Sequence, residues 1–484
     1  MTLLGLFFVP AALVCLLFSS RGLLSLLIVA SVFEAGSVFT GNIGGFVFGI
    51  SPFCFVEICV ALRLFWLVWD RGKLLPGKEA PTRTIAVLLL AFLAWSVVSS
   101  FLMPYLFAGT PVLSPRDRED LNVLLFNPEP LHWTLSNLGA AGYLVLNVCA
   151  VLFAVLVIQT AKQAETLARA LRWAVGIVIV VGILQQMAVV AGWHFPYEVF
   201  SNNPNADPDT LYQEFDGFVR INSTFSEPMN TGSFLAAAAS GLLATYLHGR
   251  RGRYLFAIVA AIAVLLLSTS TTGFLASAVM FLVLLVYFRP TKSDESGRHR
   301  LSYGGWITVT VTMLCAAGLT VLLVPSLSEA ALAMTINKGQ GTSLASRIIA
   351  DQDTIRLLAS TYGFGVGLGS TRPSSLVAAL LSTVGVVGTM IAAIVVYKII
   401  QSFPGRLAPS ILQMSFWSII GLLVADSIAV PDINRPTLWA LLLVVVAQLG
   451  IYSTAVGRAV PAEASASGRP APVQYDVEGQ RIER

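Results

Sequence analysis

Apolar runs of about twenty residues recur along almost the whole chain, and this feature limits the possible folds more than any other. One example, "LWALLLVVVAQLGIYSTAV" at 438–456, contains no charged residue. An α-helix needs about 20 mostly apolar residues to cross the hydrocarbon core of a bilayer. Thirteen such runs lie near 3–20, 22–41, 46–69, 85–109, 136–160, 174–193, 231–248, 254–269, 273–288, 306–326, 374–400, 411–429 and 437–456.

The composition excludes an ordinary soluble domain. Of the 484 residues, 56% are hydrophobic and 12% are charged, whereas soluble domains carry about 25% charged residues. We therefore predict an all-α polytopic membrane protein with about 12–13 transmembrane helices and long outer-face loops, over residues 1–456. The tail at 457–484 is rich in Ala, Pro, Ser and charge, and is predicted to be disordered and cytoplasmic.

The basic residues predict the orientation, because cytoplasmic loops carry an excess of Lys and Arg. If the loop "DRGKLLPGKEAPTRT" at 70–84 is inside, alternation leaves 22 of the 30 basic residues inside and eight outside. The N-terminus is then outside and the C-terminus inside. Topology thus accounts for the net charge of +4, which gives no indication of a nucleic-acid partner.

Three predicted outer loops are longer than a simple reversal of the chain requires, and long loops are usually functional or disordered. They span about 110–135, 194–230 and 327–373. The last contains a helical stretch at 343–360, on which Ile348 and Ile355 belong to an apolar stripe suited to the membrane surface. Arg347 and Asp351 are four residues apart and are spaced to pair on this helix.

Seven of the eight outer basic residues are arginines, which suit bidentate recognition of phosphate. Arg220, Arg347 and Arg372 lie near ends of predicted spans or in motif-like segments. Arg372 ends the glycine-rich stretch in "TYGFGVGLGSTRPSSL" at 361–376. Its glycines permit positive φ angles, and they fit either a nest of amides for a diphosphate or close packing at a helix start.

The other outer arginines have simpler interpretations. Arg116 and Arg118, in "PRDRED", each have a carboxylate neighbour and indicate a solvated turn. Arg356 follows Asp353 by three residues and is predicted to be a paired helix charge.

Four segments, in this order, resemble one family of membrane enzymes. They are "RINSTFSEPMNTGSFLA" at 220–236, "LLLSTSTTGFLA" at 265–276, "SLASR…GFGVGLGSTR" at 343–372 and "LLSTVGVVGTMIAAIVVY" at 380–397. Together they resemble the O-antigen ligase / O-antigen polymerase superfamily of bacterial membrane glycosyltransferases. The resemblance covers roughly 220–400, and the number of spans fits the whole chain.

This resemblance implies a metal-independent, inverting enzyme without a cofactor, at the outer face of the bacterial inner membrane. Its donor would be an oligosaccharide carried on undecaprenyl diphosphate, within membrane lipid. Arg220, Arg347 and Arg372 match the family's diphosphate-binding arginines. A chain-length regulator and a flippase are further candidate partners.

One departure from the family concerns the general base. The ligase branch has a histidine near the end of the large outer loop, where this chain reads "GLGSTRPSSL". The two predicted outer histidines, His132 and His194, each adjoin an aromatic residue at a helix end. The departure favours a polymerase and makes Glu227 the candidate catalytic base, seven residues from Arg220. The alternative is a helix N-terminal carboxylate stabilised by the helix dipole.

Other functions stay open. An O-antigen ligase or a protein O-oligosaccharyltransferase of the same superfamily differs from a polymerase in its acceptor. A lipid-linked oligosaccharide flippase belongs to a different class, whose members often have paired repeats and broken helices; the sequence indicates neither clearly. Glu34 and Glu57 are carboxylates within apolar runs, and such residues are functional candidates unless they reach the interface.

Overall fold

The structure is a computed structural model, and it confirms an all-α polytopic membrane protein. It describes residues 1–43, 46–77, 82–113, 128–204, 213–215, 218–249, 251–289, 307–311, 313, 315, 318, 320, 322 and 342–464. Seven of the described helices are long and apolar enough to span a membrane, and four shorter apolar helices accompany them. Every predicted span contains described helical residues, while the total of about 12–13 crossings stays a prediction.

The helices are α1 (Leu3–Phe18), α2 (Ser20–Ala30), α3 (Pro52–Arg71), α4 (Thr82–Leu106), α6 (Leu135–Val157), α7 (Ala161–Ala191), α8 (Tyr197–Phe200), α10 (Pro228–Gly249), α11 (Gly252–Ser268), α12 (Thr271–Tyr287), α15 (Thr342–Ser360), α16 (Leu376–Thr383), α17 (Gly385–Ser402), α18 (Ser410–Ala429) and α19 (Pro436–Ala464). Three antiparallel pairs of short strands join them: β1 (Phe39–Ile43) with β2 (Phe46–Ile50), β3 (Pro111–Val112) with β4 (Glu129–Pro130), and β5 (Glu214–Phe215) with β6 (Phe218–Val219).

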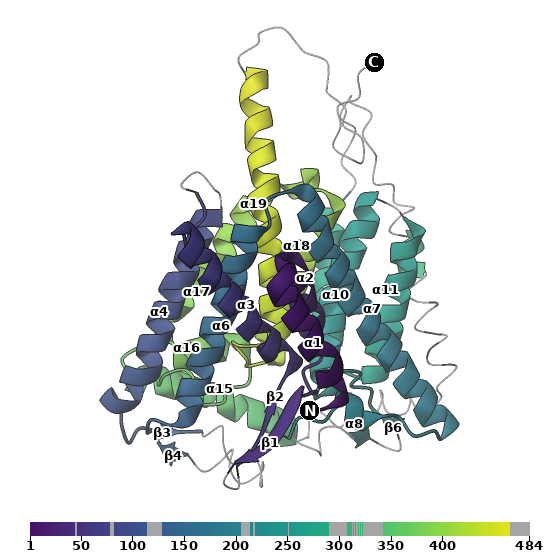
Figure 1. Ribbon diagram of the computed structural model, residues 1–484. Helices are drawn as coiled ribbons and strands as arrows, with labels where there is room; N and C mark the ends of the chain where they lie inside the picture. The colour runs from purple at the N-terminus through teal and green to yellow at the C-terminus, as the bar shows by residue number, and fades with distance from the viewer. Residues whose placement is uncertain are drawn as a thin grey trace, which may run out of the picture.

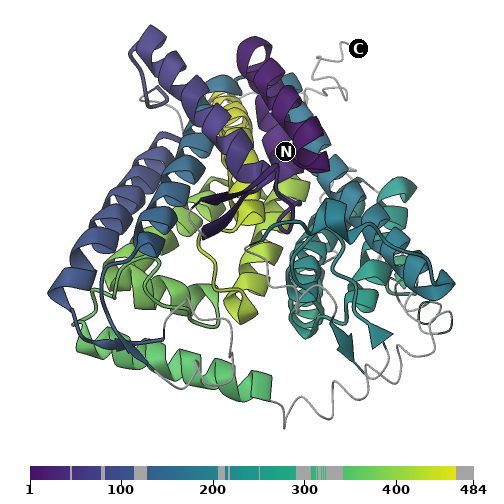
Figure 2. The same cartoon turned by 60° about the horizontal axis from the view of Figure 1, so that its bottom comes forward.

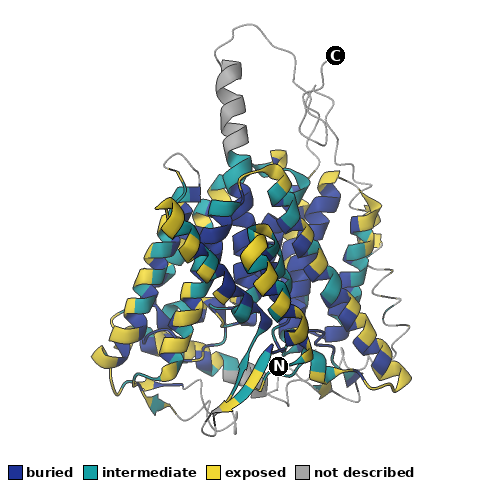
Figure 3. Cartoon of the chain, viewed as in Figure 1, coloured by how far each residue is buried: buried dark blue, intermediate teal, exposed yellow. Residues whose placement is uncertain are grey.

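The centre of the bundle is α10, in which every residue from 231 to 247 is buried. It packs against α11, α12 and α18. Small residues allow this approach: a Cβ on Gly241 would collide with the carbonyl oxygen of Met414 in α18. Figure 3 shows the buried residues concentrated in the middle of the bundle, with exposed residues on the outward sides of the peripheral helices.

The described parts of the three predicted outer loops gather at one end of the bundle. β3, β4, α8, β6 and α15 lie there beside the N-terminus, whereas α19 extends beyond the opposite end (Figure 1). Figure 2 brings the first end forward and shows α15 lying along its edge. We call the end that carries these loops the loop end, and the end beyond which α19 extends the tail end. Their separation agrees with the predicted alternation, in which the two chain termini lie on opposite sides.

The predicted span at 374–400 is interrupted, contrary to the uninterrupted run expected from its apolar sequence. The break lies at Val384 and Gly385, between α16 and α17. Gly385 has φ +66°, and a Cβ there would collide with the carbonyl oxygen of Gly363. Trp95 donates from Nε1 to the carbonyl oxygen of Val384 at 2.7 Å. Backbone groups freed within a membrane helix need such protein partners, because lipid offers none.

Other boundaries also differ from the prediction, including the run at 46–69, whose first residues form β2 before α3 begins at Pro52. The run at 22–41 forms only the eleven-residue α2, because glycine and β-branched residues from 31 onward favour turns and the β1–β2 hairpin. α7 begins at Ala161, where Thr160 and Gln163 form a capping box ahead of good helix formers. α19 continues to Ala464, eight residues into the tail predicted to be disordered. Residues 465–484 lie outside the described part of the chain.

Candidate functional site

A small cavity at the loop end brings together three of the four predicted site residues. Its volume is about 200 Å³, and its lining includes Arg220, Glu227 and Arg347. These residues come from three different stretches: the loop after β6, the loop before α10, and α15. The remaining lining residues are Gln213, Met229, Ser270, Thr271 and Thr272. Arg372, the fourth predicted residue, does not line the cavity.

Arg220 is held in place by the connection between α11 and α12. Its Nε donates to Thr269 Oγ1 at 2.9 Å and to the carbonyl oxygen of Ser268 at 3.3 Å, and Nη1 donates to Gln213 Oε1 at 2.5 Å. Thr269 adopts φ +47°, which ends α11. Burial lowers the pKa of Arg220 to about 10, with Glu227 opposing the shift. Arg220 is therefore a positioned cation at neutral pH.

Glu227 immediately precedes α10 and is half-buried. Its backbone carbonyl accepts the amides of Asn230 and Thr231, at 3.1 and 3.2 Å. Its carboxylate makes no hydrogen bond or ion pair with a residue that the structure describes, so it does not act as a side-chain cap for α10. A carboxylate that lines the same cavity as Arg220 and accepts no hydrogen bond from a described residue is suited to accept a proton from a ligand.

Arg347 approaches the same cavity from α15. Its Nη2 lies 3.4 Å from the Sδ of Met229, in the first turn of α10. The predicted pairing with Asp351 does not form, because Asp351 instead accepts a hydrogen bond from Ser374 Oγ. The guanidinium is therefore directed toward the cavity rather than along its own helix.

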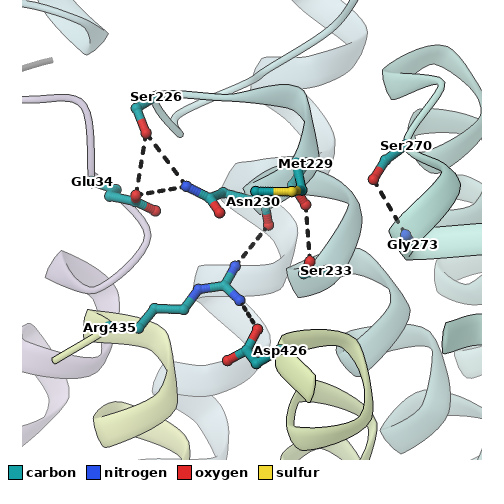
Figure 4. Close-up of polar contacts among 9 residues, drawn as sticks. All are labelled: Glu34, Ser226, Met229, Asn230, Ser233, Ser270, Gly273, Asp426 and Arg435. Atoms are coloured by element: carbon teal, nitrogen blue, oxygen red, sulfur yellow. Dashed lines mark hydrogen bonds and ion pairs between the residues drawn. The ribbon is translucent and has the colours of Figure 1, made fainter. Parts of the chain in front are cut away.

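The amino end of α12 forms the opposite wall. Ser270 caps this helix by accepting the amide of Gly273 at 3.2 Å (Figure 4), and the next two residues, Thr271 and Thr272, line the cavity. Helix amino ends carry partial positive charge and favour anions. Two arginines and one helix amino end thus surround a space with a single lining carboxylate among the described residues, which is the electrostatic character of an anion site.

The glycine-rich segment at 361–376 has the positive φ angles predicted for it. Its contacts support close packing at a helix start rather than a nest of amides for a diphosphate. Gly363, Gly365, Gly367 and Gly369 have φ between +78° and +93°. The amides of Gly365 and Gly367 donate to Thr361 Oγ1 at 3.0 Å and to the Thr383 carbonyl oxygen at 2.9 Å. A Cβ on Gly365 would lie 2.6 Å from that same carbonyl oxygen. The Gly367 amide thus contacts the end of α16 at the break, and neither amide is available for an anion nest.

The residues on either side of Glu227 belong to a polar network (Figure 4). Glu34 Oε1 accepts hydrogen bonds from Asn230 Nδ2 at 2.8 Å and Ser226 Oγ at 3.2 Å. Arg435 Nη2 donates to the carbonyl oxygen of Asn230 at 3.0 Å, and Arg435 Nη1 pairs with Asp426. Arg435 is only 1% exposed. The network therefore clamps the segment around Glu227 from two sides, through the chain after α2 and through α18 and α19.

Glu34 lies in the turn beyond α2, which ends at Ala30, and is therefore outside the helix formed by the run at 22–41. Burial raises the pKa of the Glu34 carboxyl to about 7, an effect that Arg435 opposes. Its second oxygen, Oε2, is buried without a partner among the described residues. Glu57 lies within α3, is 1% exposed and does not line the cavity.

The remaining predicted residues lie elsewhere. Arg356 pairs with Asp353, as predicted, and donates to the Pro111 carbonyl oxygen at 2.6 Å. His194 lies 2.9 Å from Glu198 on the surface, and His132 contacts the Pro130 carbonyl oxygen. Neither histidine lines the cavity. Arg116 and Arg118 lie outside the described residues. In the described ranges, no three His, Cys, Asp or Glu side chains are placed to hold a metal ion.

Sequence reasoning missed the pairing of Asp426 with Arg435. In the sequence, Arg435 is one of the eight outer basic residues, and Asp426 lies inside the predicted span at 411–429. A carboxylate within an apolar run is a signal that could have found it, since such residues are paired or functional. Comparison with known proteins adds no family to this picture: no family model matches the chain, and no curated protein matches it.

Proposed function

We propose that this chain is a membrane glycosyltransferase that polymerises undecaprenyl-diphosphate-linked repeat units into O-antigen or exopolysaccharide. The observation that carries the proposal is the meeting of Arg220, Arg347 and Glu227 at one cavity, from segments more than 100 residues apart at their extremes. The motifs that resemble the superfamily contribute these residues. In this proposal the loop end faces the outer side of the bacterial inner membrane.

The two arginines bind the donor diphosphate. A diphosphate carries two to three negative charges, and charge-assisted hydrogen bonds from guanidinium groups match its oxygens. The amino end of α12 adds a further favourable field. The volume of about 200 Å³ is below the roughly 300–1,000 Å³ of pockets for drug-sized molecules. It therefore suits the diphosphate and the adjoining sugar atoms, with the rest of the glycan and the lipid outside.

Glu227 accepts the proton in the transfer step. The acceptor hydroxyl oxygen forms a bond to the anomeric carbon of the donor sugar, and its proton passes to the Glu227 carboxylate. The bond between the anomeric carbon and the diphosphate oxygen breaks, and its electron pair leaves with the diphosphate. Arg220 and Arg347 stabilise the charge that develops on this leaving group. Attack opposite to the leaving group inverts the anomeric configuration.

A direct experiment supplies lipid-linked repeat units to the purified protein in lipid nanodiscs. We expect a ladder of longer lipid-linked glycans, resolved by gel electrophoresis or mass spectrometry. A single product in which one glycan joins a lipid A core or a peptide would instead identify a ligase or a protein O-oligosaccharyltransferase. If the protein binds the donor but glycosylates neither a second lipid-linked repeat unit, nor a lipid A core, nor a peptide when each is supplied, the transferase proposal is overturned.

A flippase for lipid-linked oligosaccharides is the alternative of a different class. The break between α16 and α17 favours it, because transporters often use broken helices. The same break is filled by the glycine-rich segment and by Trp95, which is also typical of a static packing element. Transport of a lipid-linked glycan across vesicle membranes, without any chain extension, would select this alternative.

A further inference from the structure

A second cavity lies at the tail end, away from the proposed transferase site. It has a volume of about 570 Å³ and lies among α3, α4, α6 and α19. Arg71, in the last turn of α3, and Lys73 both line it, and both are exposed. The same cavity has an apolar part formed by residues such as Leu67, Leu156 and Ile451. Basic and apolar linings therefore meet in one space.

The local electrostatics favour an anion. None of the described lining residues is acidic, and Asp70, the neighbour of Arg71, does not line the cavity. Carboxyl ends of helices would repel an anion, but Gln159 Nε2 donates to the last carbonyl oxygens of α6, those of Val155 at 2.9 Å and Leu156 at 3.2 Å. Thr82, the first residue of α4, also lines the cavity, so a helix amino end contributes positive potential.

The depth of the cavity places it near lipid headgroups. Trp66 and Trp69 precede Arg71 on α3 by five and two residues, and they are 57% and 79% exposed. Tryptophan side chains of this kind gather at the boundary between hydrocarbon and water. Arg71 and Lys73 follow them along the chain and so extend into the headgroup region. Basic pockets between transmembrane helices at this depth bind phosphate-bearing headgroups.

We propose that this tail-end basic cavity binds a phosphate-bearing anion, with Arg71 and Lys73 contacting the phosphate and the apolar part accepting an attached hydrocarbon segment. The phosphate can belong to an anionic lipid or to a small soluble compound. The apolar lining favours the lipid. This site is independent of the proposed transferase activity, since it lies at the opposite end of the bundle (Figure 1).

The test uses the full-length protein in detergent and native mass spectrometry with phosphatidylglycerol or phosphatidylcholine of matched acyl chains. We expect phosphatidylglycerol adducts in the wild type to exceed phosphatidylcholine adducts, and Arg71→Ala/Lys73→Ala to weaken phosphatidylglycerol binding by about tenfold or more. Glycerol 3-phosphate provides the soluble arm. If it competes fully with phosphatidylglycerol at millimolar concentration, the phosphate alone is the ligand; if it does not, the lipid is.

A matched control separates a built site from diffuse surface charge. Arg253→Ala/Lys398→Ala removes one arginine and one lysine from the same end, on α11 and α17, where neither residue lines the cavity. We expect this variant to bind phosphatidylglycerol like the wild type. The proposal would be overturned if both double variants lost phosphatidylglycerol binding equally. It would also be overturned if the wild type bound phosphatidylglycerol no better than phosphatidylcholine and did not bind glycerol 3-phosphate.

A steric variant tests the cavity with both charges kept. Gly450 of α19 lines the cavity beside Thr82, and a Cβ there would lie 3.2 Å from Thr82 Cγ2. Gly450→Leu therefore fills part of the space. We expect reduced phosphatidylglycerol binding, and a cooperative melting transition measured on the same preparation shows that the variant is folded. Normal binding in a folded Gly450→Leu protein would exclude the interior of the cavity as the binding site.

Discussion

Glu34 Oε1 lies 2.8 Å from the side-chain amide nitrogen of Asn230, and this hydrogen bond ties the turn after α2 to the first turn of α10. Almost 200 residues separate the two along the chain. Because Arg435 also bonds to the carbonyl oxygen of Asn230, the first turn of α10 is held from both sides. Glu227 precedes this turn directly, so its position depends on contacts that it does not itself make.

The Glu34 carboxyl gives the stability of the protein a specific pH dependence. Its pKa is raised from 4.5 to about 7 in the folded chain, so the folded state holds a proton that the unfolded state has released. The stabilising effect is complete below about pH 4.5 and is lost as the pH rises to about 7. We expect Glu34→Gln to remove this component, so that the melting temperatures of wild type and variant diverge between pH 5 and pH 7.

Melting temperature measured by intrinsic tryptophan fluorescence in detergent checks this expectation. Glu129→Gln, at a carboxylate of β4 at the same end, is the control and should follow the wild-type curve. Parallel curves for wild type and Glu34→Gln across this pH range would contradict the raised pKa.

The pair of Asp426 and Arg435 predicts a non-additive effect on stability. Asp426 is fully buried and Arg435 is 1% exposed, and loss of one partner leaves an uncompensated buried charge that costs about 3–5 kcal/mol. We expect Asp426→Leu or Arg435→Met alone to lower the melting temperature sharply, and the double variant to recover most of the loss. A double-mutant cycle measures the coupling. Single variants as stable as the wild type would show that the pair is not essential to the fold.

The fold was largely predictable because membrane helices depend on a local property, the length of an apolar run. α4, α6, α10 and α18 match predicted runs to within about three residues at each end. The break at Gly385 was not predictable from the same property, because the run at 374–400 as a whole is apolar enough for a continuous helix. It depends on the approach of the Gly363 carbonyl oxygen, which is a tertiary contact.

The residues of the candidate site were predictable from the sequence, but the contacts that hold them in place were not. Arg220, Arg347 and Glu227 stand in recognisable motifs, and the structure brings them to one cavity. Arg372 shares a motif but does not line that cavity, because its segment packs against the α16–α17 break. The network of Glu34, Asn230 and Arg435 has no local signature, since its partners come from the two ends and the middle of the chain.

Arg220→Lys tests the diphosphate role. The guanidinium uses separate nitrogens for Thr269 and Gln213, and a single ammonium group cannot reproduce this planar arrangement. We expect weaker donor binding and a strong loss of polymer, measured with purified protein and lipid-linked repeat units. Arg356→Lys is the matched control, because Arg356 pairs with Asp353 away from the cavity. Arg372→Lys should retain more activity than Arg220→Lys. A fully active Arg220→Lys protein would remove the diphosphate role from Arg220.

Glu227→Gln tests the base. The variant keeps the size and the backbone contacts of Glu227, but its amide cannot take the proton of the acceptor hydroxyl near neutral pH. If Glu227 is the general base, donor binding stays normal and the rate of chain extension falls by about 10²–10⁴. If Glu227 is only a carboxylate at the amino end of α10, Glu227→Gln lowers the free energy of unfolding by less than about 1 kcal/mol and leaves turnover nearly normal.

In a third case, Glu227 acts indirectly, through its effect on Arg220. Donor affinity, melting temperature and rate, measured on the same Glu227→Gln preparation, separate the three cases. Glu227 opposes the lowered pKa of Arg220, so the two side chains interact electrostatically, and loss of the negative charge can act through Arg220. In that case donor affinity itself changes together with the rate. A slow variant with normal donor affinity supports the base, because only the proton-transfer step then needs the carboxylate. Glu129→Gln, away from the cavity, should leave all three measurements unchanged.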